Sequence, residues 1–127
     1  MDQVITFTTR KFDVSKEDEN PINPIHGKSL LIWLKENLAG KFELSEPEPE
    51  DWGWYAYINW QGRSYLLGVR AREINHPDYE WVFQIDKQRS LKEKLLGKQK
   101  MTSNDECFNF VKSLFESEPE IKNVAVE

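Results

Sequence analysis

The segment from Trp52 to Trp60 constrains the fold more than any other part of this chain. Large side chains recur at every second position, which is the period of a β-strand, where successive side chains point to opposite faces. The residues Gln61-Gly62-Arg63 then predict a turn, and Ser64–Arg72 returns with a second alternating pattern, so the two segments predict a β-hairpin. In the first strand one face is expected to carry Trp52, Trp54, Ala56, Ile58 and Trp60, and the other Gly53, Tyr55, Tyr57 and Asn59.

Other periodic segments surround this hairpin. β-Branched and aromatic residues predict four more strands, at Gln3–Thr9, Lys41–Ser45, Glu80–Asp86 and Ile121–Val126. Helical spacing and serine–glutamate capping patterns predict helices at Lys28–Leu38, from Ser90 to Gly97 and from Ser103 to Ser117. We expect the short middle helix to be anchored by Leu91, Leu95 and Leu96.

The order of these elements predicts an α+β fold. A mainly antiparallel sheet with a central meander would carry two or three helices packed on one face. Residues 11–27 hold two Asn-Pro pairs and are expected to form a long loop, because proline biases the preceding residue away from helix. Residues 73–79 predict a longer turn between strands. The chain of 127 residues is expected to form a single domain, 1–127.

Composition narrows the class of protein. Charged residues make up 31% and aromatic residues 13%, and so many aromatic side chains argue against a disordered chain. We see no apolar stretch long enough to cross a membrane and no secretory signal, which predicts a cytoplasmic protein with no membrane partner. The net charge of -5 argues against nucleic acid as a partner, since phosphate binding depends on Lys and Arg.

The net charge hides two opposite poles. Residues 43–51 contain five acids and no base, whereas residues 87–100 contain six bases and one acid, Glu93. Two interpretations stay open at this point. The poles are solvated surfaces that keep the protein in solution, or one of them docks a partner of opposite charge.

The acidic pole runs directly into the aromatic strand. Trp and Tyr dominate binding hot spots, so this junction is the main candidate site. If the rings all lie in the core, the segment is structural; if helices cover one face only, the other exposes aromatic surface for a partner. The candidate partner-binding residues are Glu46, Glu48, Glu50, Asp51, Trp52, Tyr55 and Tyr57. Gly53 and Gly68 interrupt strands, and we interpret them as making room for a neighbouring tryptophan.

A second candidate is a ligand pocket around His76, Asp78 and Tyr79. Histidine titrates near neutral pH and could exchange a proton with a nearby carboxylate. No motif places a nucleophile beside it, and we predict no catalytic residue, no metal and no cofactor. The single cysteine, Cys107, lies on an apolar helix stripe and is expected to be a buried structural thiol.

A short motif carries a resemblance. Residues Pro49-Glu50-Asp51-Trp52-Gly53-Trp54-Tyr55 are followed by Gly62-Arg63 and Tyr65, and later by Trp81 and Arg89-Ser90-Leu91. In this pattern, across residues 28–97, the chain resembles small uncharacterised bacterial proteins with a PEDWGW core motif. The resemblance implies a bacterial origin and assigns no activity to any residue.

The sequence therefore predicts a small acidic, non-enzymatic binding protein. Its sharpest version is an immunity-type protein that neutralises a basic toxin, such as a nuclease, through residues 46–57. The four acids would mimic phosphates, and Trp52 or Tyr55 would anchor the contact. The alternatives are a small-molecule-binding domain or minor enzyme with a pocket near His76, and a structural subunit that oligomerises through an exposed sheet face or edge.

Overall fold

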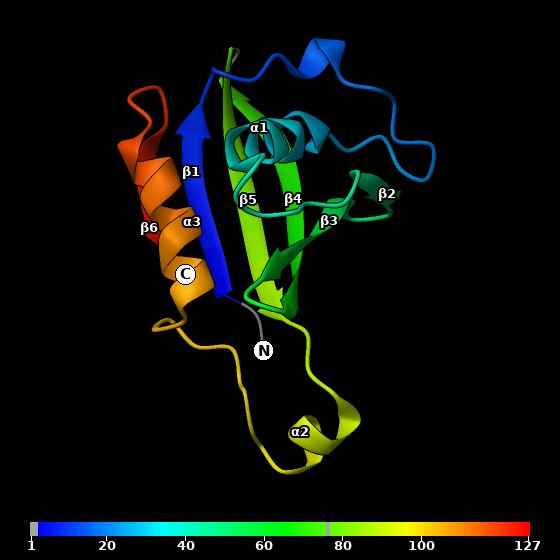
Figure 1. Ribbon diagram of the computed structural model, residues 1–127. Coiled ribbons are helices and arrows are strands. Elements are labelled where there is room, and N and C mark those ends of the chain that lie inside the picture. Colours follow the sequence, from blue (N-terminus) through cyan, green and yellow to red (C-terminus); the bar gives the residue numbers. More distant parts are fainter. Residues whose placement is uncertain (1–2, 76) are drawn as a thin grey trace.

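The computed structural model describes residues 3–75 and 77–127, and its centre is a six-stranded antiparallel sheet (Figure 1). The order across the sheet is β2-β3-β4-β5-β1-β6. The strands are β1 (Gln3–Thr9), β2 (Glu48–Glu50), β3 (Gly53–Trp60), β4 (Arg63–Asn75), β5 (Asp78–Lys87) and β6 (Lys122–Val126). Consecutive strands β2 to β5 form the predicted meander, and β1 lies between β5 and β6.

Two helices cover one face of this sheet, as the α+β prediction required. They are α1 (Lys28–Leu38) and α3 (Glu106–Ser117), which both lie in front of the sheet in Figure 1. The two helices contact each other through aromatic side chains: the ring of Trp33 on α1 stacks on that of Phe115 on α3, with 6.3 Å between the ring centroids. Phe115 also contacts Phe7 of β1 and Phe83 of β5, so one continuous apolar layer separates the helices from the sheet.

The third helix, α2 (Leu91–Leu95), does not join this layer. The structure describes all of its residues, and none of them is buried. The prediction that Leu91, Leu95 and Leu96 anchor the helix is therefore wrong, because these side chains are 73%, 78% and 56% exposed. The predicted capping box is nevertheless present between Ser90 and Glu93, since it depends only on neighbouring residues.

Several predicted boundaries shift where backbone pairing decides them. Within Lys41–Ser45 only Leu44 bridges to β3, and the edge strand forms further along the chain, at β2, which begins at Glu48. Pro47 stands between them and has no amide proton for the ladder. β4 extends to Asn75, so the predicted turn at 73–79 is shorter. α3 begins after Asp105 rather than Ser103, because the Asp105 carboxylate accepts the Phe108 amide at 3.1 Å.

Residues 11–27 contain one short 3-10 turn, Val14–Lys16. A backbone bridge from His26 to Ala71 of β4, the core side chains of Phe12 and Val14, and several side-chain hydrogen bonds tie this segment to the rest of the fold. The Glu17 carboxylate accepts the backbone amides of Gly27, Lys28 and Ser29 at 2.9, 3.2 and 3.0 Å. These are free donors at the start of α1, whose own N-cap, Gly27, supplies no side chain. A distant carboxylate therefore caps this helix.

Among residues 3–75 and 77–127, no helix combines the length and the apolar character that a membrane crossing requires.

Candidate protein-binding face

The face of the sheet opposite α1 and α3 carries the tyrosines of β3. Trp54, Ala56 and Ile58 point into the core and are buried, as alternation predicts. Tyr55 and Tyr57 point the other way; Tyr55 is half-buried, and Tyr57 is 42% exposed. Their rings meet edge to face, with centroids 5.9 Å apart. Aromatic surface is therefore open to a partner on the side that the helices leave free.

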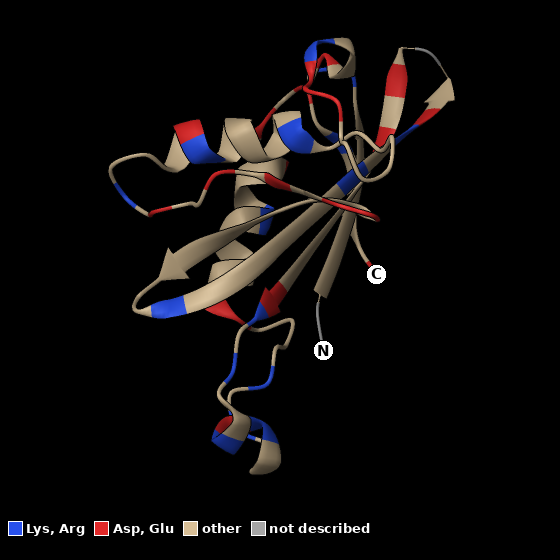
Figure 2. Cartoon of the chain, turned by 90° about the vertical axis from the view of Figure 1, so that its right-hand side faces the viewer, with Lys and Arg blue, Asp and Glu red and all other residues tan. Residues whose placement is uncertain are grey.

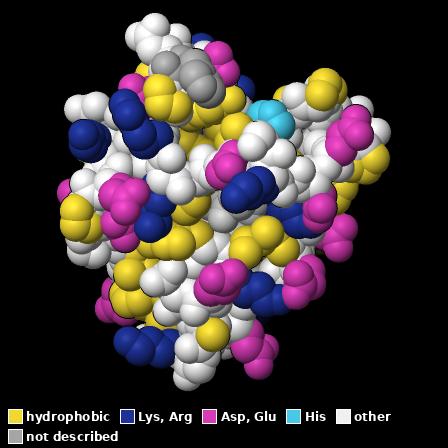
Figure 3. All heavy atoms as spheres, turned by 90° about the horizontal axis from the view of Figure 1, so that it is seen from above, with side chains coloured by type: hydrophobic (Ala, Val, Ile, Leu, Met, Phe, Trp, Pro, Cys, Tyr) yellow, Lys and Arg dark blue, Asp and Glu magenta, His cyan; other side chains and the backbone are white. Residues whose placement is uncertain are grey.

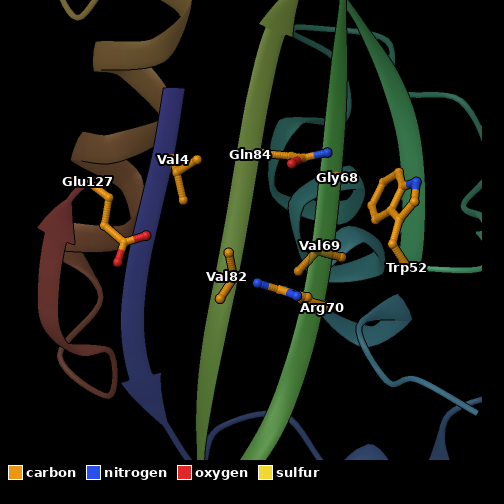
Figure 4. A pocket seen from close by; sticks show the side chains of 8 residues that line it. All are labelled: Val4, Trp52, Gly68, Val69, Arg70, Val82, Gln84 and Glu127. Carbon is orange, nitrogen blue, oxygen red and sulfur yellow. The ribbon is translucent and has the colours of Figure 1, made fainter. Parts of the chain in front are cut away.

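Trp52 lies on this same face, not on the core face that the alternating pattern predicted. It precedes β3 in the turn after β2, so the strand pleat does not fix its direction. Its ring lies over Gly68 of β4 (Figure 4), where a Cβ atom would stand only 2.7 Å from the ring carbon Cη2. The interpretation of Gly68 as room for a tryptophan is thus confirmed.

The close neighbour that requires glycine at position 53 is a different one. Its φ is 152°, and a Cβ there would come within 2.2 Å of the backbone carbonyl oxygen of Val69. The close neighbour is the backbone of β4 rather than an indole ring. The tryptophan interpretation is therefore wrong at this glycine.

The acids of β2 join the aromatic side chains through strand register. Glu48 pairs with Tyr55, and Glu50 pairs with Gly53, and directly paired residues share a face. Glu48, Glu50, Trp52, Tyr55 and Tyr57 together are called the acidic edge face below. Asp51 occupies the turn beside them and is exposed.

Glu46 departs from this group. Its carboxylate is bonded to the ammonium group of Lys35 on α1, on the helical side of the molecule. The hydrogen bond from Lys35 holds the pKa of Glu46 below its ordinary value. Of the four predicted acids, the fold therefore places Glu48 and Glu50 beside the tyrosines and directs Glu46 elsewhere.

One buried amide holds the turn of the acidic edge face. The Asn20 Nδ2 donates to the carbonyl oxygens of Glu50 and Gly53, at 3.0 and 2.9 Å. Its Oδ1 accepts the amides of Ile22 and Asn23, at 2.9 and 3.1 Å. The only sequence signal for this role is the Asn-Pro pair that begins at Asn20, and that pair predicts a loop but not the bonds that the side chain makes.

The open face is also hollowed beside Trp52. A depression of about 370 Å³ is lined by Trp52, Gly68, Arg70, Val82 and Gln84, together with Val4 of the neighbouring strand (Figure 4). A second depression, of about 440 Å³, shares Arg70 and Val82 with it. The surface beside the acidic edge face can therefore receive protruding side chains.

The structure describes two of the three residues of the second predicted site, and one of them, Asp78, lines a depression of about 550 Å³ together with Arg10 and Ile74. His76 lies outside the described residues. The Asp78 carboxylate forms two hydrogen bonds with Arg10, at 3.1 and 3.3 Å, and the Tyr79 hydroxyl donates to Glu73 at 3.1 Å. Burial, followed by the bond to Glu73, raises the pKa of Tyr79. Figure 3 views this end of the molecule, where basic, acidic and hydrophobic side chains are interspersed.

A polar cluster that the sequence analysis did not find lies between the sheet and the start of α3. The Asp105 carboxylate accepts the Tyr65 hydroxyl at 2.8 Å and the Lys87 ammonium at 3.0 Å. Burial alone would raise the pKa of Asp105, but the hydrogen bonds from Phe108, Lys87 and Tyr65 lower it. Burial and the bond to Asp105 raise the pKa of Tyr65. These groups satisfy one another, so the cluster joins β4, β5 and α3.

Cys107 is fully buried, which confirms its interpretation as a structural thiol. Burial raises its pKa to about 12, with a smaller effect from Asp105, so the thiol is protonated at neutral pH. Within residues 3–75 and 77–127, His, Cys, Asp and Glu side chains form no group of three or more suited to a metal ion.

Comparisons of the chain with protein-family models, with curated proteins and with solved structures found no match. The basis for a function is therefore the chemistry of the surfaces just described.

Proposed function

We propose that this protein is a non-enzymatic binding protein that engages a basic protein partner through the acidic edge face. One observation carries the proposal. The β2–β3 register places Glu48 and Glu50 on the same helix-free face as Tyr55, and Tyr57 is open to solvent beside them. Carboxylates next to exposed aromatic rings suit Lys and Arg side chains, which pair with the former and stack on the latter.

The rigidity of this surface supports the same function. Tyr and Trp bury a large area while losing little side-chain entropy, which is why they anchor interfaces. Trp52 is set by its contact with Gly68, and Asn20 fixes the turn that connects the acids to the rings. A partner would therefore meet a preformed surface and would not have to order it on binding.

The finer proposal is a bacterial immunity-type protein that neutralises a basic toxin. A nuclease active site attracts phosphate groups with Lys and Arg side chains, and a neighbouring pair of carboxylates offers the same charge. Glu48 and Glu50 stand two residues apart on an edge strand, with no further strand outside it in the described sheet. Their carboxylates can thus enter a concave basic site, while Trp52 or Tyr55 anchors its rim.

The test is a charge reversal. The E48K/E50K variant is compared with an E36K/E116K control, which makes the same net change on exposed positions of α1 and α3. Basic proteins captured by the wild type from source cells are purified, and their affinities are measured by calorimetry over a salt series. We expect E48K/E50K to weaken binding at least about tenfold and to remove most of the salt dependence. Equal affinity for both variants would contradict the proposal.

A further inference from the structure

Residues 88–100, here called the basic finger, project from the end of the sheet, and no residue of the α2 helix within them is buried (Figures 1 and 2). Three leucines in the finger, Leu91, Leu95 and Leu96, expose more than half of their side-chain surface. Single exposed apolar residues are common on soluble proteins. Three within six residues, on a projecting segment, indicate a surface that a partner covers.

The finger is held in this position by specific bonds. The Arg63 guanidinium forms two hydrogen bonds with the Glu93 carboxylate, at 3.1 and 2.7 Å, and a third with the Gln88 carbonyl oxygen at 2.8 Å. Across the base of the finger, Arg89 donates to the Lys98 carbonyl oxygen at 3.1 Å. The exposure of the leucines is thus part of the folded structure.

The charge of the finger selects the chemistry of its partner. It carries five basic residues, and its single acid, Glu93, is engaged by Arg63. The leucines therefore alternate in sequence with basic residues, and Figure 2 shows blue Lys and Arg segments in and around α2. A surface that covers them must be acidic and must also offer apolar or aromatic contacts.

The acidic edge face has these properties, but the finger of the same molecule is far from it. The finger follows Lys87, which pairs with Tyr65 near the Trp60 end of β3, whereas Glu48 and Glu50 pair with the opposite end. Seven residues of strand separate Gly53 from Trp60, or roughly 20 Å at the rise of a β-strand. The finger extends away from that strand (Figure 1).

We infer that the basic finger docks on the acidic edge face of a second copy of this chain. Lys92 and Lys94 would pair with Glu48 and Glu50, and the leucines would cover the aromatic rings and the depression beside Trp52. Each copy supplies one finger and one acidic edge face, so two copies can make the contact reciprocally about a twofold axis. The inference rests on the proposed function in that both use the acidic edge face. A basic partner would therefore have to displace the finger of the second copy from that face.

Charge exchange between the two surfaces tests this inference. Mass is measured by analytical ultracentrifugation over a wide concentration range for the wild type, for K92E/K94E and for E48K/E50K. We expect the wild type to rise above the 15.0 kDa of one chain with increasing concentration, and each variant to stay at that mass. An equimolar mixture of the two variants should associate again, because each supplies the charge that the other needs. Circular dichroism checks that both variants are folded.

The remaining outcomes separate this inference from the proposed function. A wild type that stays at the mass of one chain, or a mixture of variants that does not associate, overturns the second-copy contact. If the chains do not self-associate but E48K/E50K binds the basic partner more weakly than the wild type, the proposed function is supported and the second-copy contact is not. Binding of the monomeric wild type to phosphatidylglycerol vesicles, lost in L91S/L95S, would assign the finger to a lipid surface and also overturn the inference.

Discussion

The indole ring of Trp52 occupies the space above Gly68 that a side chain would otherwise fill, with 2.7 Å between a Cβ at position 68 and the ring. This contact joins the turn after β2 to the middle of β4. It also directs Trp52 to the open face of the sheet, beside the acidic residues.

Substitution of Gly68 by alanine should therefore displace Trp52. We expect G68A to lower the free energy of unfolding by about 1–3 kcal/mol, as overpacking does elsewhere, and to weaken binding of the basic partner. Urea denaturation gives the stability. In a W52A background the added cost of G68A should fall, because the ring is gone. An equal cost in both backgrounds would locate the strain at Gln84, whose side chain is the other close neighbour.

The remote cap of α1 predicts a stability effect in the long loop. Glu17 is nearly buried and serves three backbone amides together with the Ser29 hydroxyl. We expect E17A to lower the free energy of unfolding by about 1–3 kcal/mol, because buried donors lose their acceptor. E19A, an exposed acid in the same loop, is the matched control and should behave as wild type. Similar denaturation midpoints for both variants would argue against the cap.

The Asp105 cluster predicts a larger effect. In D105N the amide group would face the Lys87 ammonium, and a mostly buried cation would lose its carboxylate. We expect a loss of about 3 kcal/mol in the free energy of unfolding. The D105N/K87M variant should recover part of that loss, since the unpaired charge is removed. Chemical denaturation of the wild type, D105N, K87M and D105N/K87M forms a double-mutant cycle, and an absence of coupling would refute the ion pair.

The ion pair between Arg63 and Glu93, which holds the finger in position, should depend on pH. The hydrogen bonds from Arg63 and from the Ser90 amide lower the pKa of Glu93 from 4.5 to about 2. A lowered pKa stabilises the folded state above pH 4.5, and that contribution is lost as the pH falls from 4.5 towards 2. An NMR titration of the Glu93 carboxyl carbon should show this midpoint. In R63Q the midpoint should move back towards 4.5, and a midpoint equal to that of the wild type would show that Arg63 is not the cause.

The strands and α1 could be predicted because their signals are local. Alternation in β3 and helical spacing in α1 follow from side-chain direction within one element. The register between β2 and β3 decided which acidic side chains lie beside aromatic rings. Glu48 lies beside Tyr55 because the two residues pair across the strands, and no local sequence pattern predicts that pairing. The cap from Glu17 to Gly27 and the bond from Asn20 to the Glu50 carbonyl oxygen were missed for the same reason, since each joins residues 10 or more positions apart in the chain.

The sequence by itself determined β1, β3 to β6 and the three helices, an antiparallel sheet with a central meander, and the room that Gly68 leaves for a tryptophan. Only the tertiary structure decided that Trp52 leaves the core face, that Glu46 turns to Lys35, and that three leucines stand outside the core. The physical reason is that an apolar side chain is buried only if another element lies against it. For the finger, no element of the described chain does so.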